Sequence, residues 1–497
     1  MTEPSDSTWF GHPRGLSVLF FTEMWERFSY YGMRALLVLF MVDAIEHGGM
    51  GLDEQKAGAI YGLYTSAVYL VALPGGWIAD RLLGAQRSIW IGGLIIAAGH
   101  FTLAIPSISA FYVGLVLVVI GTGFLKPNIS AIVGQLYPEG GASRDAGFTV
   151  FYMGINLGAF LGPLICSYLG EKVSWHAGFA AAGVGMVAGA IQYRLSSKAL
   201  GDAGLHPHRR EGAGDSGRVD PAWYVFIGGV LLVVLVLVLS LTGVIRLNPV
   251  MLAQKATYVI VALAVVFFLS VFLFGKLTSS EKRQTSVILI LFFASAVFWS
   301  GFEQAGSSLN LFADRHTDRI LERVNFEIPA GWFQSLNPFF IVTLAPVFAA
   351  FWVKLAKRNL DPALPTKFAL GTLMLGLGFL IMVGAAKLVV AGNEAAPYWL
   401  ILTYLLHTMG ELCVSPVGLS SVTKLAPKRF VGQMMGIWFL ATALGNLIAG
   451  LMAGRFNPES IQEMPSLFLQ IVLVAAGSGL LLLVFTKPIQ KLMDGVK

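Results

Sequence analysis

Long runs of apolar residues, each bounded by charged residues, glycine or proline, form the dominant pattern along this chain. A helix needs about 20 apolar residues to cross the ~30 Å hydrocarbon layer of a membrane. Runs of this length occur at residues 16–42, 54–80, 88–105, 110–136, 145–169, 175–195, 222–243, 251–274, 284–313, 331–356, 366–390, 396–422, 431–454 and 465–486. The pattern therefore predicts an all-α integral membrane protein with fourteen transmembrane helices.

One long hydrophilic segment, residues 196–221, interrupts this pattern after six runs. It is rich in glycine, histidine and arginine, and it divides the chain into unequal parts. We expect an N-terminal six-helix bundle at 1–195, a cytoplasmic linker at 196–221, a two-helix insert at 222–283 and a C-terminal six-helix bundle at 284–497.

Composition excludes several classes of protein. Of the 497 residues, 56% are hydrophobic and only 12% are charged, whereas soluble domains carry about 25% charged residues. The two cysteines, Cys166 and Cys413, lie inside apolar runs and do not form a disulfide framework of the secreted type. The first apolar run is too long for the core of a cleavable signal peptide, so we expect it to remain in the mature protein.

The formal net charge of +6 follows from membrane topology. If both termini are cytoplasmic, basic residues such as Arg81, Arg87 and Arg144 collect in cytoplasmic loops, as the positive-inside rule requires. Anionic lipid headgroups can balance this charge, so it does not indicate nucleic-acid binding. We expect a multi-pass protein of the cell membrane, in contact with membrane lipid and with both ends in the cytoplasm.

Charged residues inside the apolar runs are the candidate functional groups. Each would cost about 2.5–3.5 kcal/mol at the centre of a membrane helix if it stood alone. Such groups are expected to pair around a water-filled cavity; the alternative is that they form ion pairs that only lock helices together. They are Glu23, Glu26, Arg27, Arg34, Lys126, Glu303 and Glu411.

The spacing in the first run places several of these charges together. Glu23 and Arg27 are four residues apart, and Arg27 and Arg34 are seven apart. These three side chains therefore share one face of a helix, with Glu26 alongside.

The segment from Gly76 to Arg87 has the pattern Gly-x-x-x-Asp-Arg-x-x-Gly-x-x-Arg. This pattern resembles the cytoplasmic signature of the major facilitator superfamily. The resemblance implies secondary transport by two six-helix bundles.

Three further segments narrow the resemblance. Glu-x-x-Glu-Arg at 23–27 is followed by Phe-Ser-Tyr-Tyr-Gly, residues 151–159 read FYMGINLGA, and residues 410–427 read GELCVSPVGLSSVTKLAP. Together they resemble the proton-coupled oligopeptide transporter family, whose prokaryotic members are similar in having two extra helices between the halves. The resemblance implies proton-coupled uptake of di- and tripeptides by alternating access. It implies no enzymatic activity, no metal and no cofactor other than the coupling proton.

Carried over position by position, the resemblance also implies a binding site for peptide. Arg34 and Lys126 would face the peptide carboxylate, and Glu411 would hold the ammonium group. Asparagine side chains would bind the peptide backbone, and aromatic residues would line side-chain pockets. The implied substrate-binding residues are Tyr30, Tyr31, Arg34, Tyr69, Lys126, Asn156, Trp299, Asn337, Glu411, Ser415 and Trp438.

Proton coupling and gating are assigned to the same charges. The attraction of Arg27 and Lys126 favours the ionised form of the nearby glutamates, whereas desolvation favours their protonated form. A bound substrate can therefore shift the equilibrium between the two forms. The expected coupling residues are Glu23, Glu26, Arg27 and Glu303. The expected gate residues are Arg34, Glu303, Lys126 and Glu411, with Arg34 and Glu303 meeting when the outer mouth closes.

Other functions remain as alternatives. A related carrier of nitrate or another small anion is disfavoured because a buried Glu411 repels anions. A channel is disfavoured by the paired halves, and a membrane-embedded enzyme by the lack of catalytic motifs. The oligomeric state is left open, a monomer included.

Two histidine positions bear on these predictions. Mammalian relatives carry a histidine in the second helix where this chain has Gly62, so a proton relay cannot use that position. His407 lies four residues before Glu411, and we interpret it as a hydrogen-bonded structural residue.

Overall fold

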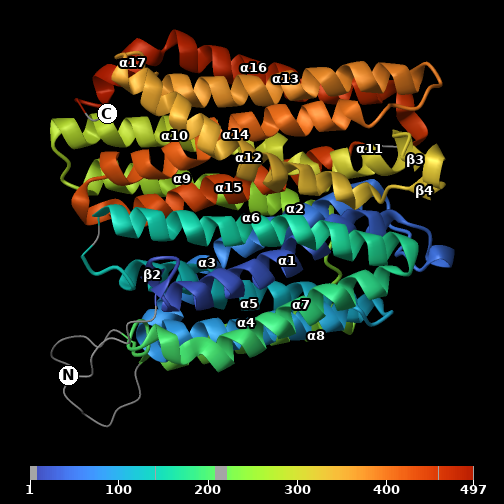
Figure 1. The fold of residues 1–497 in the computed structure, drawn as a ribbon, viewed down its shortest axis with the longest axis horizontal. Coiled ribbons are helices and arrows are strands. Elements are labelled where there is room, and N and C mark those ends of the chain that lie inside the picture. Colours follow the sequence, from blue (N-terminus) through green and yellow to red (C-terminus); the bar gives the residue numbers. More distant parts are fainter. Residues whose placement is uncertain (1–7, 140, 208–220, 457, 496–497) are drawn as a thin grey trace. The chain divides into compact units, whose positions relative to one another are not determined.

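The computed structural model of this chain describes residues 8–139, 141–207, 221–456 and 458–495, most of them in helices (Figure 1). The chain forms two compact units. The first contains Met1–Leu36 and Leu70–Asn248, and the second contains Leu37–Tyr69 and Pro249–Lys497. The long helix α1, Gly15–Val42, begins in the first unit and ends in the second.

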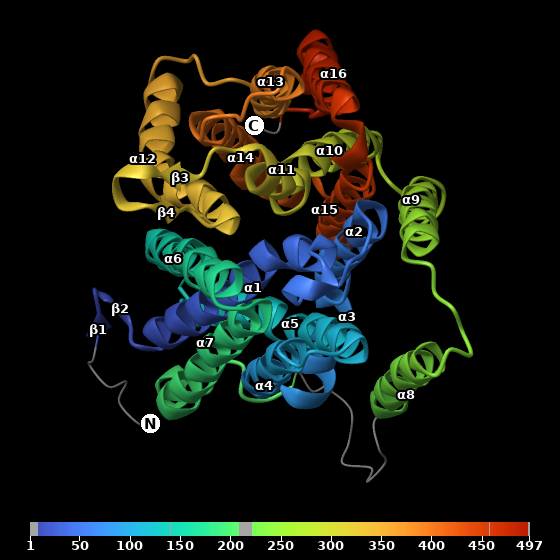
Figure 2. The same ribbon diagram turned by 90° about the vertical axis from the view of Figure 1, so that its right-hand side faces the viewer.

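The first unit is a helical bundle preceded by a short hairpin. Helix α4 packs against both α5 and α7, and α6 packs against α7 (Figure 2). Its elements besides α1 are β1 Thr8–Trp9, β2 His12–Pro13, α3 Ala72–Ile78, a π-helical turn at Ala79–Leu83, α4 Ala85–Leu103, α5 Ile108–Gln135, α6 Gly141–Lys172, α7 Trp175–Ser196, a 3₁₀ turn at Ser197–Leu200 and α8 Pro221–Leu241.

The second unit is a larger bundle. Helix α13 packs against α14 and α16, α15 packs against α9 and α10, and α12 packs against α14. Its elements are α2 Glu54–Leu70, α9 Pro249–Phe274, α10 Ser279–Phe302, α11 Ser308–His316, β3 Ile320–Leu321, β4 Phe326–Glu327, α12 Leu336–Lys357, α13 Leu364–Val390, α14 Tyr398–Leu425, α15 Val431–Ala453, α16 Met464–Val484 and α17 Thr486–Leu492, with 3₁₀ turns at Ile45–His47, Glu303–Gly306, Glu322–Val324, Ala330–Ser335, Lys428–Phe430 and Pro458–Glu463.

The predicted all-α membrane fold is confirmed in its main features. Eleven helical segments of the described chain are long and apolar enough to cross a membrane. Helix α1 is not among them, although its bounds agree with the predicted run to within one residue, because four charged residues interrupt it. The number of fourteen membrane spans stays a prediction. Two short antiparallel hairpins, β1–β2 and β3–β4, were not predicted; they lie outside the apolar runs.

Two predicted runs are divided in the structure. The run 54–80 ends as α2 at Leu70 and resumes as α3, where Pro74 occupies the third position and has no N–H to donate to a preceding turn. The run 284–313 is broken between α10 and α11 at residues 303–307.

The predicted linker begins as an ordered segment. Gln86, in the first turn of α4, donates from Nε2 to the carbonyl oxygens of Gly201 at 2.9 Å and Ala203 at 2.8 Å. The backbone N–H of Gln86 donates to the carbonyl of Gly204. The start of the linker is therefore hydrogen-bonded to the first turn of α4, at the end of the segment that carries the Asp-Arg signature. Residues 208–220 of the predicted linker lie outside the described residues.

Helix α8 stands apart from the other helices of the first unit (Figure 2). No part of its most apolar stretch is buried. Near its first turn the ring of Phe226 lies 6.2 Å from that of Phe124 in α5. The apolar side chains of α8 are therefore mostly exposed.

In the second unit, α2 and α15 cross with their backbones in contact. A Cβ atom added at Gly450 would lie 2.6 Å from the Cα of Gly62 and would also strike the carbonyl oxygen of Gly58. Small residues allow such close helix packing in membranes. Gly62 is thus part of a tight crossing with no room for a larger side chain.

Candidate functional site

A buried cluster of three charges lies on α1. Arg27 Nε is 2.9 Å from Glu23 Oε1 and 2.5 Å from Glu26 Oε2. The three residues are 4%, 3% and 1% exposed, respectively. The Arg27 guanidinium therefore forms ion pairs with both carboxylates in a site shielded from water. The sequence spacing predicted this group, and the structure brings it together.

Helix α6 covers this cluster closely. A Cβ atom added at Gly158 would lie 2.9 Å from the backbone nitrogen of Phe28 and 3.0 Å from the Cβ of Arg27. Gly158 of the FYMGINLGA segment thus permits the backbone of α6 to pack against the Glu-x-x-Glu-Arg segment of α1.

A fourth charge reaches the cluster from α5. Lys126 is half-buried and lies close enough to Glu26 for electrostatic attraction. Pro127, the next residue, lies inside α5. The structure therefore brings Glu23, Glu26, Arg27 and Lys126 into one electrostatic group within the first unit.

Aromatic rings accompany the arginines of α1. The guanidinium carbon of Arg27 lies 5.5 Å from the ring centre of Tyr30, and that of Arg34 lies 5.4 Å from that of Tyr31. The two tyrosine rings pack edge to face at 5.1 Å. Arg34 is buried, and such cation–π contacts help to hold a desolvated guanidinium.

Asn156, also predicted to bind substrate, lies on α6 and is buried. Its Nδ2 donates to the carbonyl of Tyr152 in the preceding turn at 2.9 Å.

In the second unit, the acid predicted to hold the peptide ammonium is itself held by an amide. Asn337 of α12 donates from Nδ2 to Glu411 Oε2 at 2.9 Å and to Thr408 Oγ1 at 3.0 Å. Thr408 in turn donates to the carbonyl of Tyr404 at 2.7 Å. Glu411 is half-buried. Thr408 was not predicted from the sequence, although its position three residues before Glu411 places it on the same helix face.

The remaining predicted residues of this unit lie on four helices. Glu303 is buried and caps the end of α10, and Trp299 lies one turn earlier with its ring 5.2 Å from that of Phe302. Ser415 is half-buried one turn beyond Glu411, Trp438 of α15 is buried, and Tyr69 is half-buried near the end of α2.

His407 has a structural environment, in agreement with its interpretation from sequence. Its ring lies 4.8 Å from that of Phe379 and hydrogen-bonds to the backbone of Leu375. Gly378 leaves the space for it, since a Cβ there would lie 2.5 Å from the His407 ring.

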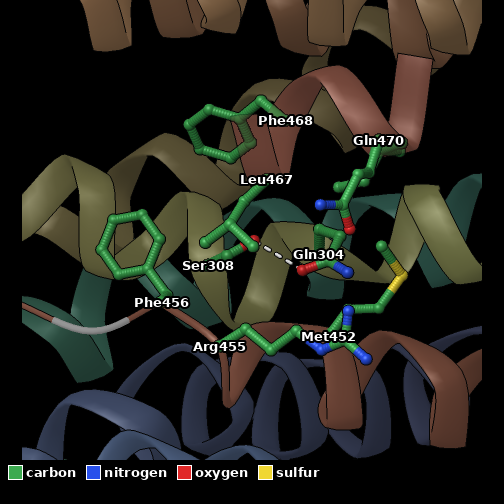
Figure 3. A pocket seen from close by; sticks show the side chains of 9 residues that line it. Gln304, Ser308, Met452, Arg455, Phe456, Leu467, Phe468 and Gln470 are labelled. Atoms are coloured by element: carbon green, nitrogen blue, oxygen red, sulfur yellow. Dashed lines mark hydrogen bonds between the residues drawn. The ribbon is translucent and has the colours of Figure 1, made fainter. Parts of the chain in front are cut away.

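A small pocket opens elsewhere in the second unit (Figure 3). Its lining includes no residue predicted to bind substrate, and it has room for about one water molecule. It is therefore too small to receive a peptide. The described residues contain no group of three or more histidine, cysteine, aspartate or glutamate side chains that could hold a metal ion. The pocket is lined by Gln304, Ser308, Met452, Arg455, Phe456, Leu467, Phe468, Gln470 and Ile471.

A comparison with known protein families tests the family that the motifs suggest. The sequence model of the POT family matches residues 86–466. The chain belongs to the POT family. The family resemblance predicted from the sequence is confirmed, and the chain is a transporter rather than an enzyme.

Similar POT proteins cover nearly the whole chain. A protein named peptide transporter YePEPT from Yersinia enterocolitica is 43% identical over 99% of this chain and 98% of its own length. A di-/tripeptide transporter from Lactococcus lactis is 37% identical over 99% of both chains.

Solved POT structures share the fold. A crystal structure of a peptide transporter POT in complex with sulfate has a TM-score of 0.89 and 41% identity, covering 98% of this chain and 97% of its own. A POT family transporter in complex with a thioalcohol-conjugated peptide has a TM-score of 0.87 and 36% identity, covering 97% of this chain and 98% of its own.

The charges of this POT chain divide unevenly between its units. The predicted site residues of the first unit include three cations, Arg27, Arg34 and Lys126, and two anions. Those of the second unit include two anions, Glu303 and Glu411, and no cation. The first set can bind a carboxylate, and the second set can bind an ammonium group.

Proposed function

We propose that this chain is a proton-coupled importer of di- and tripeptides that works by alternating access in the cell membrane, with both termini in the cytoplasm. The observation that carries the proposal is the half-buried Glu411 carboxylate, oriented by Asn337. A buried acid binds an ammonium group and repels an anion. The names of the relatives, peptide transporter and di-/tripeptide transporter, support the same substrate class.

The proposed roles of the other residues follow from their charge and surroundings. Lys126 and Arg34 bind the peptide carboxylate. Asn156 and Asn337 bind the backbone amides that every peptide shares. The aromatic residues accept side chains of varied shape, because the constant groups of the peptide already set its orientation. The remaining proposed substrate contacts are Tyr30, Tyr31, Tyr69, Trp299, Ser415 and Trp438.

The proton is proposed to bind at the glutamates. Attraction by Lys126 favours the ionised form of the Glu26 carboxyl group. When a peptide carboxylate engages Lys126, Glu23 and Glu26 lose part of their countercharge, their affinity for a proton rises, and a proton is carried with the peptide. Glu303 is proposed to act in the same way. No cofactor takes part, and the coupling ion is the proton.

The proton gradient provides sufficient driving force. One proton moving through ~100 mV supplies about 2.3 kcal/mol, and a difference of one pH unit supplies about 1.4 kcal/mol. Together they support roughly 500-fold accumulation of a neutral solute.

Transport into proteoliposomes tests the proposal. We expect labelled dipeptide to exchange against unlabelled dipeptide in counterflow and to accumulate when the external medium is made acidic. A tripeptide should compete and nitrate should not. Uptake of nitrate without uptake of peptide would favour the anion-carrier alternative, and equilibration without accumulation would indicate a channel.

A further inference from the structure

Helix α10 ends directly before Glu303, and Glu303 begins a break in this membrane run. Helix α10 ends at Phe302, a 3₁₀ turn covers Glu303–Gly306, and α11 begins at Ser308. The backbone at Ser307 has φ −129° and ψ −98°, which is not helical. The position of the Glu303 carboxylate therefore depends on the contacts that fix the backbone at this break.

A helix break leaves backbone carbonyls without their usual helical partners. Two side chains donate hydrogen bonds to backbone carbonyls here. Gln304 Nε2 donates to the carbonyl of Ser300 at 3.4 Å, and the hydroxyl of Tyr404, from α14, donates to the carbonyl of Ala305 at 3.3 Å.

Gln304 makes further bonds at both ends of its amide. Its Nε2 also donates to the carbonyl of Ala449 in α15 at 3.3 Å, and its Oε1 accepts from Ser308 Oγ at 2.5 Å (Figure 3). Gln304 is 1% exposed and Ser308 is 4% exposed. One buried amide thus bonds to α10, α11 and α15 at once.

The hydrogen bond from Gln304 to α15 lies next to a close contact between helices. Ala449 directly precedes Gly450, where the backbone of α15 contacts Gly58 and Gly62 of α2. Gln304 therefore connects the break beside Glu303 to the tight crossing of α2 and α15.

We propose that Gln304 is a positioning residue for Glu303. Its amide joins the two sides of the broken helix and fixes them to α15, so that Glu303 stands at a defined place and moves together with α15. The inference rests on the proposed function, because Glu303 matters for transport only if the chain couples peptide to protons.

An apolar side chain at position 304 removes all three hydrogen bonds of the Gln304 amide. The carbonyl of Ala449 and the hydroxyl of Ser308 would remain buried without this partner, which is costly in an interior. The break would then relax to another arrangement. Since Glu303 is placed by the break, coupling should suffer more than peptide binding.

The test compares two glutamines that line the same pocket. Gln304→Leu removes the buried amide, and Gln470→Leu removes an exposed one carried by α16 (Figure 3). For Gln304→Leu we expect the KM for dipeptide in counterflow to stay within about twofold of wild type, while the rate of proton-driven accumulation falls about tenfold. Gln470→Leu should behave as wild type in both assays.

The outcomes separate this inference from the proposed function. If wild type itself accumulates no peptide under a pH gradient, the proposed function fails. If wild type and Gln470→Leu accumulate peptide and folded Gln304→Leu does so equally well, the positioning role is overturned and the proposed function stands.

A second pair of variants serves if Gln304→Leu does not fold. Ser308→Ala removes the hydroxyl that bonds Gln304, and Ser308→Thr retains it. We expect accumulation to fall in Ser308→Ala with counterflow preserved, and to be restored in Ser308→Thr. Equal accumulation in Ser308→Ala and wild type would overturn the proposal.

Discussion

Asn337 Nδ2 and Glu411 Oε2 lie 2.9 Å apart, although 74 positions separate them in the chain. This hydrogen bond joins α12 to α14 and sets the direction of the carboxylate. The pair therefore presents the Glu411 carboxylate in a fixed orientation.

Replacing this acid should abolish recognition of the peptide N-terminus. We expect Glu411→Ala to weaken dipeptide binding roughly 30-fold or more, because removing one partner of a desolvated charge pair costs about 2 kcal/mol or more. Acetylating the dipeptide N-terminus should weaken binding to wild type strongly and to Glu411→Ala only slightly. Binding would be measured by competition in counterflow. Equal losses in both proteins would remove the ammonium-binding role.

Neutral replacements in the α1 cluster should uncouple transport from protons. Glu23→Gln and Glu26→Gln mimic a permanently protonated acid beside Arg27. We expect each variant to retain exchange of peptide in counterflow and to lose accumulation driven by a pH gradient. Glu463→Gln, at an exposed acid before α16, is the control. A variant that still concentrates peptide would show that its glutamate is not essential for coupling.

The crossing of α2 and α15 should tolerate no side chain larger than hydrogen at its centre. We expect Gly450→Leu to push the helices apart toward the usual axial separation of about 8–10 Å. A cysteine pair placed on α2 and α15 beside the crossing should then cross-link more slowly than in wild type. Gly432→Leu in the same helix is the control, because a Cβ there has no neighbour within 4 Å. An unchanged cross-linking rate in Gly450→Leu would contradict the close contact.

The stability of the first turn of α2 should depend on pH through Asp53. Its Oδ1 accepts from the backbone N–H of Lys56 at 2.7 Å. Burial opposes ionisation, but hydrogen bonds and the charge of Lys56 together lower the Asp53 pKa. Because the folded pKa is lowered from an ordinary value of about 4, this cap stabilises the helix above that pH and is lost as the pH falls through the folded pKa.

Amide hydrogen exchange measures this effect. At pH 7 we expect Asp53→Ala to speed exchange at the first turn of α2 about fivefold, since a helix cap contributes ~1 kcal/mol. At a pH below the folded pKa of Asp53, variant and wild type should exchange alike. A fivefold difference that persists in acid would show that the cap does not depend on the charge.

Several features were predictable because they depend on neighbours in the chain. The predicted run 16–42 matches α1, Gly15–Val42, since hydrophobicity over one helix length sets a membrane span. The ion pairs of Arg27 with Glu23 and Glu26 followed from helical spacing alone. The motifs of α1, α6 and α14 were sufficient to indicate the family.

Other features had weak or no local signal. The run 284–313 contains no proline, so its break after Glu303 was not predicted, although Gln304 in an apolar run was a polar signal that could have drawn attention to it. The glycines of α2 and α15 gave no indication in the sequence that they pack against each other.

The membrane class of this protein, its family and its set of candidate charged residues could all be predicted from the amino-acid sequence. These depend on composition, periodicity and motifs, which are local properties of the chain. The partner of each polar group is instead set by tertiary packing: Glu411 bonds to Asn337, and Gln304 bonds to Ala449 and Ser308. A buried polar group must find a partner wherever packing brings one within about 3 Å, and packing joins segments far apart in the chain.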